Sequence, residues 1–204
     1  MSMSRIRIQF LVFSLIYFFA YCNAVFAVTK TTTASGSWSN PAIWSPTGVP
    51  ASSDDVVISS AHNITISQQT FCKTLVVSGG AVLSLSPSKL LQINGAVNIA
   101  GTFDMNGGNV KQLLNNAALQ IGVTGKLIWN PGDNTLTGAS LLTNSVETFN
   151  ETSTLEIKKW YSYATVPLAS VITGNLGNVT ISTQVGSTLF EWNQNNQFES
   201  RECR

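Results

Sequence analysis

The sequence predicts an all-β protein, folded as a right-handed parallel β-helix with a cap at its N-terminal end. Apolar runs of three or four residues recur every six to nine residues, with apolar side chains mainly at alternate positions. Gly, Ser, Asn or Pro separates these runs, and sustained helical spacing is nearly absent. Such short runs bury too little surface to hold a hairpin alone, whereas in stacked coils each strand is paired on both sides. An antiparallel β-sandwich is the alternative.

The chain divides into four parts. Residues 1–27 have the pattern of a signal peptide, because two arginines precede an apolar run of about a dozen residues and a small-residue AVFA end. That run is shorter than the roughly 20 residues that a membrane-spanning helix needs. Residues 28–35 are a Thr-rich lead-in, 36–192 the β-helix domain, and 193–204 a polar tail that is frayed or cut short of further coils. We therefore expect a secreted or cell-surface protein.

Residues 36–58 are expected to form the cap and the first strand of the domain. Trp38 and Trp44 flank an Asn-Pro turn, and a second turn that ends at Pro50 leads into two acids and a β-branched run. We expect both indoles to pack over the open end of the first coil, because its core would otherwise meet water.

After the cap, the apolar runs follow one another as candidate strands. They are VVI at 56–58, ITI at 64–66, LVV at 75–77, LSL at 83–85, LQI at 91–93, VNI at 97–99 and TFDM at 102–105. The segment 110–121 is compatible with a short helical turn or with two more strands. The second half continues with less regular runs such as KLIW and NVTIST, and its glycines suit corners that need positive φ.

Charge and cysteine content exclude some classes of partner. Without residues 1–27 the chain has nine basic and ten acidic residues, a formal net charge of −1. With no basic stripe and no polybasic segment, we expect neither nucleic acid nor anionic lipid as a partner. Cys22 leaves with the signal peptide, and Cys72 lies in an apolar pattern typical of a buried free thiol, although a bond to Cys203 stays open.

The sequence offers no catalytic set. Asp54 and Asp55 are adjacent, so on a strand they point to opposite faces and cannot act as an acid–base pair. One of them is expected to accept backbone N–H bonds in the turn after Pro50. His62 is the only histidine, so a zinc site or a Ser-His-Asp triad would rest on it alone. We expect no catalytic residue, no metal site and no cofactor.

Aromatic residues near turns supply a binding hypothesis. Trp129 precedes an Asn-Pro-Gly-Asp turn, and Trp160 and Tyr161 follow a pair of lysines. Aromatic faces that are exposed beside polar amides stack against sugar rings, so these three residues are the candidate ligand-binding group. Packing inside the fold is the competing role for them.

The cap also carries a family resemblance. GSWSNPAIW, followed by GVP, DDVVI and HNITI, resembles the repeated opening of large secreted proteins of Bacteroidetes-type bacteria and is similar to the eight-glycine (G-eight) domain of animal cell-surface proteins. The residues that fall on this pattern are Trp38, Trp44, Pro50, Asp54, Asp55, Val56, Ile58 and His62. Ala61 stands where the family commonly places glycine. The resemblance implies a β-rich extracellular module, joined in some relatives to polysaccharide-degrading or adhesive regions.

Two functions stay open at this point. The first is a non-catalytic secreted or cell-surface structural or adhesive module with weak glycan binding, whose partner is an extracellular polysaccharide or a cell-surface glycan. The second is the N-terminal part of a carbohydrate-active β-helix enzyme whose catalytic coils lie elsewhere. Clustered acids in later coils would favour the enzyme.

Overall fold

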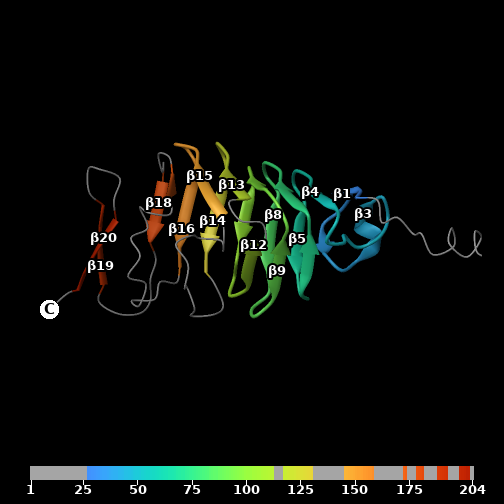
Figure 1. The fold of residues 1–204 in the computed structure, drawn as a ribbon, viewed down its shortest axis with the longest axis horizontal. Coiled ribbons are helices and arrows are strands. Elements are labelled where there is room, and N and C mark those ends of the chain that lie inside the picture. The colour runs from blue at the N-terminus through green and yellow to red at the C-terminus, as the bar shows by residue number, and fades with distance from the viewer. Residues whose placement is uncertain are drawn as a thin grey trace, which may run out of the picture.

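The fold is taken from a computed structural model of the chain (Figure 1). It describes residues 27–112, 117–130, 145–158, 172–173, 178–181, 188–192 and 198–202. The predicted signal peptide, Trp160, Tyr161 and Cys203 lie outside the described residues.

Stacked parallel strands form a β-solenoid, which confirms the predicted parallel β-helix (Figure 1). In spatial order, sheet A contains β17 (Ile172–Thr173), β15 (Ser145–Phe149), β13 (Ala117–Ile121), β10 (Val97–Ile99), β7 (Thr74–Val77), β4 (Asp55–Ile58), β1 (Thr29–Thr32) and β3 (Trp44–Ser45). Sheet B contains β18 (Asn178–Ile181), β16 (Thr154–Ile157), β14 (Lys126–Trp129), β11 (Thr102–Asp104), β8 (Val82–Leu85), β5 (Asn63–Ile66) and β2 (Gly36–Ser37). Sheet C contains β12 (Asn109–Gln112), β9 (Leu90–Ile93) and β6 (Thr70–Cys72). A separate antiparallel pair follows, β19 (Thr188–Trp192) and β20 (Phe198–Glu202).

Inward apolar residues stack in register from coil to coil. On sheet A the column contains Val56, Leu75, Val97 and Leu119, and on sheet B it contains Ile64, Leu83, Phe103, Leu127 and Leu155. All of these side chains are buried. Side chains alternate between the two faces of a strand, so one face of each short run joins the shared core and the other meets solvent. Each buried aliphatic side chain stabilises the fold by roughly 1.5–3 kcal/mol.

The cap closes the N-terminal end of the stack. Strand β3 pairs antiparallel with β1 and ends sheet A, and the short 3-10 helix η1 (Pro41–Ile43) precedes it. As predicted, Trp38 and Trp44 are buried; their rings meet edge to face with centroids 5.1 Å apart. The Trp44 Nε1 donates to the Trp38 carbonyl at 2.9 Å. The cap thus covers an apolar end that would otherwise face water.

The Lys30 side chain fastens the cap to the first coil. Lys30 is largely buried, and its Nζ donates to the carbonyl oxygens of Pro46 and Thr47 at 2.9 and 3.2 Å. These two bonds replace part of the hydration that the ammonium loses on burial. The loop that follows β3 is therefore held against β1.

A repeated turn joins sheet A to sheet B. In the coils that begin with β4, β7, β13 and β15, the N–H groups of His62, Ala81, Gly125 and Ser153 donate to the carbonyl three residues earlier, at 2.8 to 3.2 Å. In the later coils, the first residue of the turn also donates its N–H to the preceding coil. The acceptor is the carbonyl oxygen of the last residue of the sheet A strand in that coil, as when Ser78 donates to Ile58. Turns as well as strands are therefore hydrogen-bonded from coil to coil.

Candidate functional site

The structure does not place Trp129 on the surface. Its side chain is 2% exposed, and it lies in the core with Leu127 and Phe103. Alternation along β14 explains this position, since Leu127 and Trp129 share the inward face and Ile128 takes the other. The expectation of an exposed indole at Trp129 is therefore wrong. Within the described residues the Trp129 Nε1 has no hydrogen-bond partner.

The two adjacent acids face apart, as predicted. Asp54 is buried, and its carboxylate accepts the N–H groups of Val28 and Ala51 at 3.2 and 2.9 Å. The bond from Ala51 confirms the expected role in the turn after Pro50. Asp55 accepts the Thr74 hydroxyl at 2.7 Å and pairs with the Lys73 Nζ at 3.4 Å. Both carboxylates are thus occupied by structural contacts.

His62 contributes to a contact between the first coil and the corner after β4. The Thr32 Oγ1 lies 2.8 Å from the His62 Nδ1 and accepts the Ser59 N–H at 2.8 Å. The Ser59 hydroxyl donates to the Thr32 carbonyl at 2.9 Å. This arrangement ties β1 to the next turn, and none of its members is a catalytic acid that could orient the imidazole.

Cys72 is buried with its side chain inward from β6, as predicted for a free thiol. Burial, together with the negative charge of Asp55, raises the pKa of the Cys72 thiol to about 12. Because the thiolate is the reactive species, this thiol stays protonated and inert at neutral pH.

A charged cluster lies on the outer side of sheet B. The Glu156 carboxylate contacts the Lys126 Nζ at 2.6 Å and the Lys158 Nζ at 3.6 Å. The hydrogen bond from Lys126 and the two positive charges hold the pKa of Glu156 below its ordinary value, against an opposing effect of burial. The described residues contain no group of three His, Cys, Asp or Glu side chains that could hold a metal ion.

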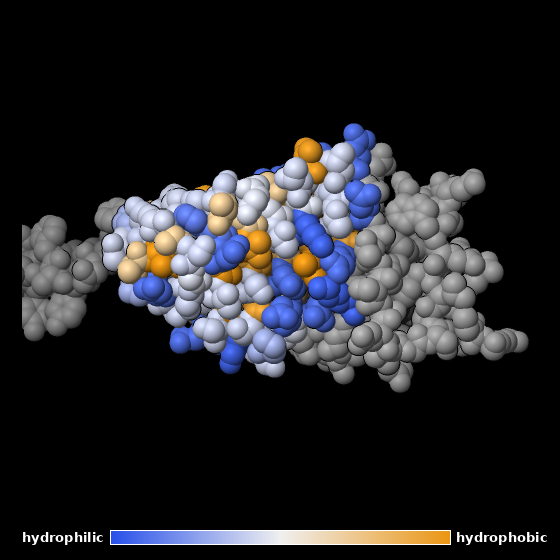
Figure 2. Space-filling view, turned by 180° about the vertical axis from the view of Figure 1, so that it is seen from behind, coloured by the Kyte–Doolittle hydropathy of each residue, from blue (hydrophilic) through white to orange (hydrophobic). Residues whose placement is uncertain are grey.

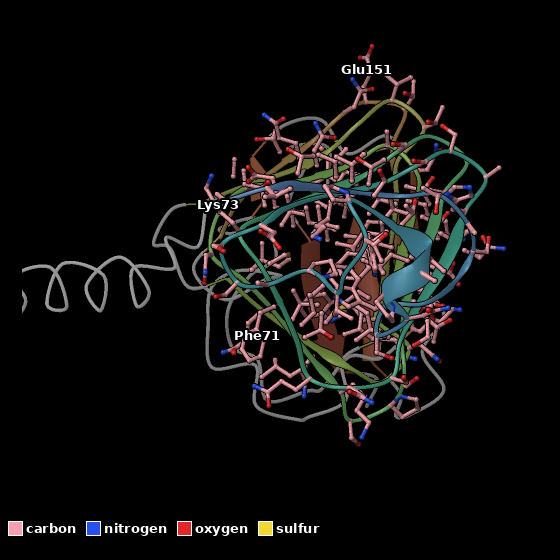
Figure 3. The ribbon with its side chains drawn as sticks, turned by 90° about the vertical axis from the view of Figure 1, so that its right-hand side faces the viewer. Phe71, Lys73 and Glu151 are labelled. Carbon is pink, nitrogen blue, oxygen red and sulfur yellow. The ribbon has the colours of Figure 1, made fainter. Side chains whose placement is uncertain are left out.

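The outer face of sheet C carries an exposed aromatic ring that the sequence interpretation missed. Phe71 is 39% exposed, while its neighbours Thr70 and Cys72 are buried. Figure 3 shows its ring projecting away from the solenoid. The inward side chain of Cys72 was the available signal, because alternation then puts Phe71 outward.

Two amide side chains are close to Phe71 along the chain or in register. Gln92 is the register partner of Phe71 on the next coil, and Gln69 lies two residues before Phe71. The Gln69 Nε2 lies 3.5 Å from the Gln92 Oε1, at the limit of a hydrogen bond. We call the outward residues Gln69, Phe71, Leu90 and Gln92 the sheet C face. The other large apolar side chains that are exposed among the described residues, Val49 and Val123, are aliphatic.

The family comparison covers almost the whole described fold. A family model with the description "Domain of unknown function (DUF8693)" matches residues 29–201, from β1 to β20. The chain belongs to the DUF8693 family. No curated protein and no solved structure matches this DUF8693 chain. None of the helices in the described part of the chain is long and apolar enough to cross a membrane.

The surface of this DUF8693 chain is mixed rather than broadly apolar. In the view of Figure 2, apolar residues occur as separate spots among polar ones. The described carboxylates of Asp54, Asp55 and Glu156 bind backbone groups, a hydroxyl or lysines. The sheet C face, by contrast, offers an exposed ring and two amide groups to solvent, and it is the candidate binding site.

Proposed function

We propose that this DUF8693 chain is a non-catalytic secreted or cell-surface module, structural or adhesive in role, that binds glycan through the sheet C face. The observation that carries the proposal is the exposed Phe71 ring on the same face as the neighbouring amides of Gln69 and Gln92. An aromatic face is electron-rich and attracts the C–H groups on the apolar side of a sugar ring. The two amides supply donors and acceptors for sugar hydroxyls.

The backbone behind this face suits adhesion. Phe71 and Gln92 lie on adjacent hydrogen-bonded strands of a parallel sheet, which keeps their spacing constant. Side chains held by a rigid element lose less conformational freedom on binding than those on a loop. A single ring and two amides support weak binding, which many copies on a surface would strengthen through multivalency.

The non-catalytic part of the proposal is supported by three described carboxylates that already have partners. Glycoside hydrolysis needs two free carboxyl groups at a suitable separation. Asp54, Asp55 and Glu156 each stabilise the fold instead. The secreted or surface location is supported by the signal-peptide pattern of residues 1–27.

Glycan binding to the purified protein without residues 1–27 tests this proposal. We expect the protein to bind a subset of polysaccharides on a glycan array, and Phe71→Ala to weaken that binding by about 2- to 12-fold, the range for an aromatic contact. Val123→Ala removes an exposed apolar side chain at a corner and should leave binding unchanged. Circular dichroism would verify that both variants remain folded. An array with no bound glycan, or equal binding by Phe71→Ala, contradicts the proposal.

A further inference from the structure

The three segments that carry sheet C contain lysines and no acids. Residues 67–73, 86–96 and 106–112 include Lys73, Lys89 and Lys111 but neither Asp nor Glu. In the described part of the chain, these three segments therefore carry an excess of positive charge.

Most other described lysines are already neutralised or buried. Lys126 and Lys158 pair with Glu156, and Lys30 is turned into the cap. Among the lysines of the sheet C segments, Lys73 pairs with Asp55, the first residue of β4. Lys89 is partly exposed, and no carboxylate of the described residues forms an ion pair with it.

Lys89 and Lys111 belong to the strands of sheet C or to their immediate ends. Lys89 immediately precedes β9, and its carbonyl accepts the Asn109 N–H of β12 at 2.7 Å. Lys111 is the register partner of Gln92, which is in turn the register partner of Phe71. Phe71, Gln92 and Lys111 therefore occupy the same register position in three successive coils.

We infer that the ligand of the sheet C face is an acidic polysaccharide, whose carboxylate or sulfate groups meet Lys89 and Lys111 while a sugar ring lies on Phe71. This inference rests on the proposed glycan binding and adds the charge of the ligand. An ammonium group is a point charge on a flexible stem, which suits acidic groups spaced along a polymer. A polyanion lying across the coils would cross the register positions of Phe71, Gln92 and Lys111 in turn. Nucleic acid is the less favoured polyanion, since two lysines release few counterions.

The test compares polymers that differ only in charge. Binding is measured by affinity electrophoresis for polygalacturonate and its methyl ester, and for carboxymethylcellulose and hydroxyethylcellulose. We expect the acidic member of at least one pair to bind at least several-fold more tightly. The difference should shrink between about 0.1 and about 1 M NaCl, because the screening length falls from about 10 to about 3 Å.

Two sets of variants separate the roles on this face. Lys89→Gln with Lys111→Gln should weaken binding of the acidic polymer by about 2- to 5-fold per lysine, as for exposed ion pairs, and leave the neutral polymer unaffected. Phe71→Ala should weaken both. Lys158→Gln, which removes an exposed lysine directly after the sheet B strand β16, is the matched control and should change neither.

Each other outcome contradicts a particular step. Equal binding of acidic and neutral polymers at both salt concentrations overturns the acidic class and leaves the proposed glycan binding standing. Binding of none of the four polymers, together with an empty array, overturns both. If a single-stranded oligonucleotide binds more tightly than any acidic polysaccharide, the partner is a nucleic acid and the inference is overturned.

Discussion

At the scale of single residues, the corner after β4 shows what the solenoid demands of its backbone. Ala61 has φ +65°, in the left-handed region that side chains disfavour. Gly80 occupies the same turn position one coil later, with φ +77°. The resembled family commonly has glycine at the position of Ala61, and the backbone angle supplies the physical reason.

Exchanging the two residue types at these positions should have opposite effects. Ala61→Gly relieves the strained φ and should stabilise the fold by up to about 1 kcal/mol. The greater conformational entropy of glycine in the unfolded chain opposes this gain. Gly80→Ala should destabilise it by about 1 kcal/mol, and its added Cβ has room, since the nearest atom would lie 3.8 Å away. Urea denaturation measures both values. If the two substitutions shift stability in the same direction, the backbone explanation fails.

At the scale of elements, the corners between sheets A and B differ in length. Four residues join β4 to β5, β7 to β8 and β13 to β14, whereas only two, Ala100 and Gly101, join β10 to β11. This tighter corner brings its backbone against the next coil. A Cβ on Gly125 would collide with the Ile99 carbonyl oxygen and lie 2.9 Å from the Ile121 Cγ2.

Gly125→Ala should therefore destabilise the protein by at least about 2 kcal/mol, because backbone on both sides must shift to admit the methyl group. Gly79→Ala is the matched control at a roomier corner, where the nearest atom would lie 3.8 Å away. It should change stability by no more than about 0.5 kcal/mol. Thermal and urea unfolding measure the stability of the two variants. Similar stabilities would show that the backbone around Gly125 can move to admit the methyl group.

At the scale of the whole molecule, stability depends on closing the end of an open stack. A solenoid ends in unpaired strand edges and an uncovered apolar core, which together favour aggregation. The antiparallel strand β3 covers the edge of β1, and the buried pair Trp38 and Trp44 covers the core. The cap therefore protects the fold as well as contributing to its core.

Trp44→Ala should cost about 3 to 5 kcal/mol in the free energy of unfolding, as for other large-to-small core substitutions. It should also raise the tendency to aggregate, since the end of the stack is loosened. Phe71→Ala removes an aromatic residue of comparable size from the surface and should cost far less. Chemical denaturation and light scattering provide the two readouts, and an unchanged stability for Trp44→Ala would show that the cap is dispensable.

The local pattern of the sequence was sufficient to identify most strands of the first half. The runs expected at 64–66, 83–85 and 91–93 are the cores of β5, β8 and β9. Strand β6 (Thr70–Cys72) was not among the expected runs, because its inward positions hold Thr70 and Cys72 and its one large apolar residue points outward. The segment from Val110, left open between helix and strands, contributes β12 and β13 to two different sheets.

The sequence by itself determined the fold class, the position of the cap and the opposed directions of Asp54 and Asp55, because these depend on alternation, turn residues and adjacency within one segment. Only the tertiary structure decided which strands stack, since coil length varies: Val56 pairs with Leu75, 19 residues later, but Ala117 pairs with Ser145, 28 residues later. The same register decided the candidate site. It brought Phe71 beside Gln92 from the next coil, and contacts between coils are not encoded in either segment alone.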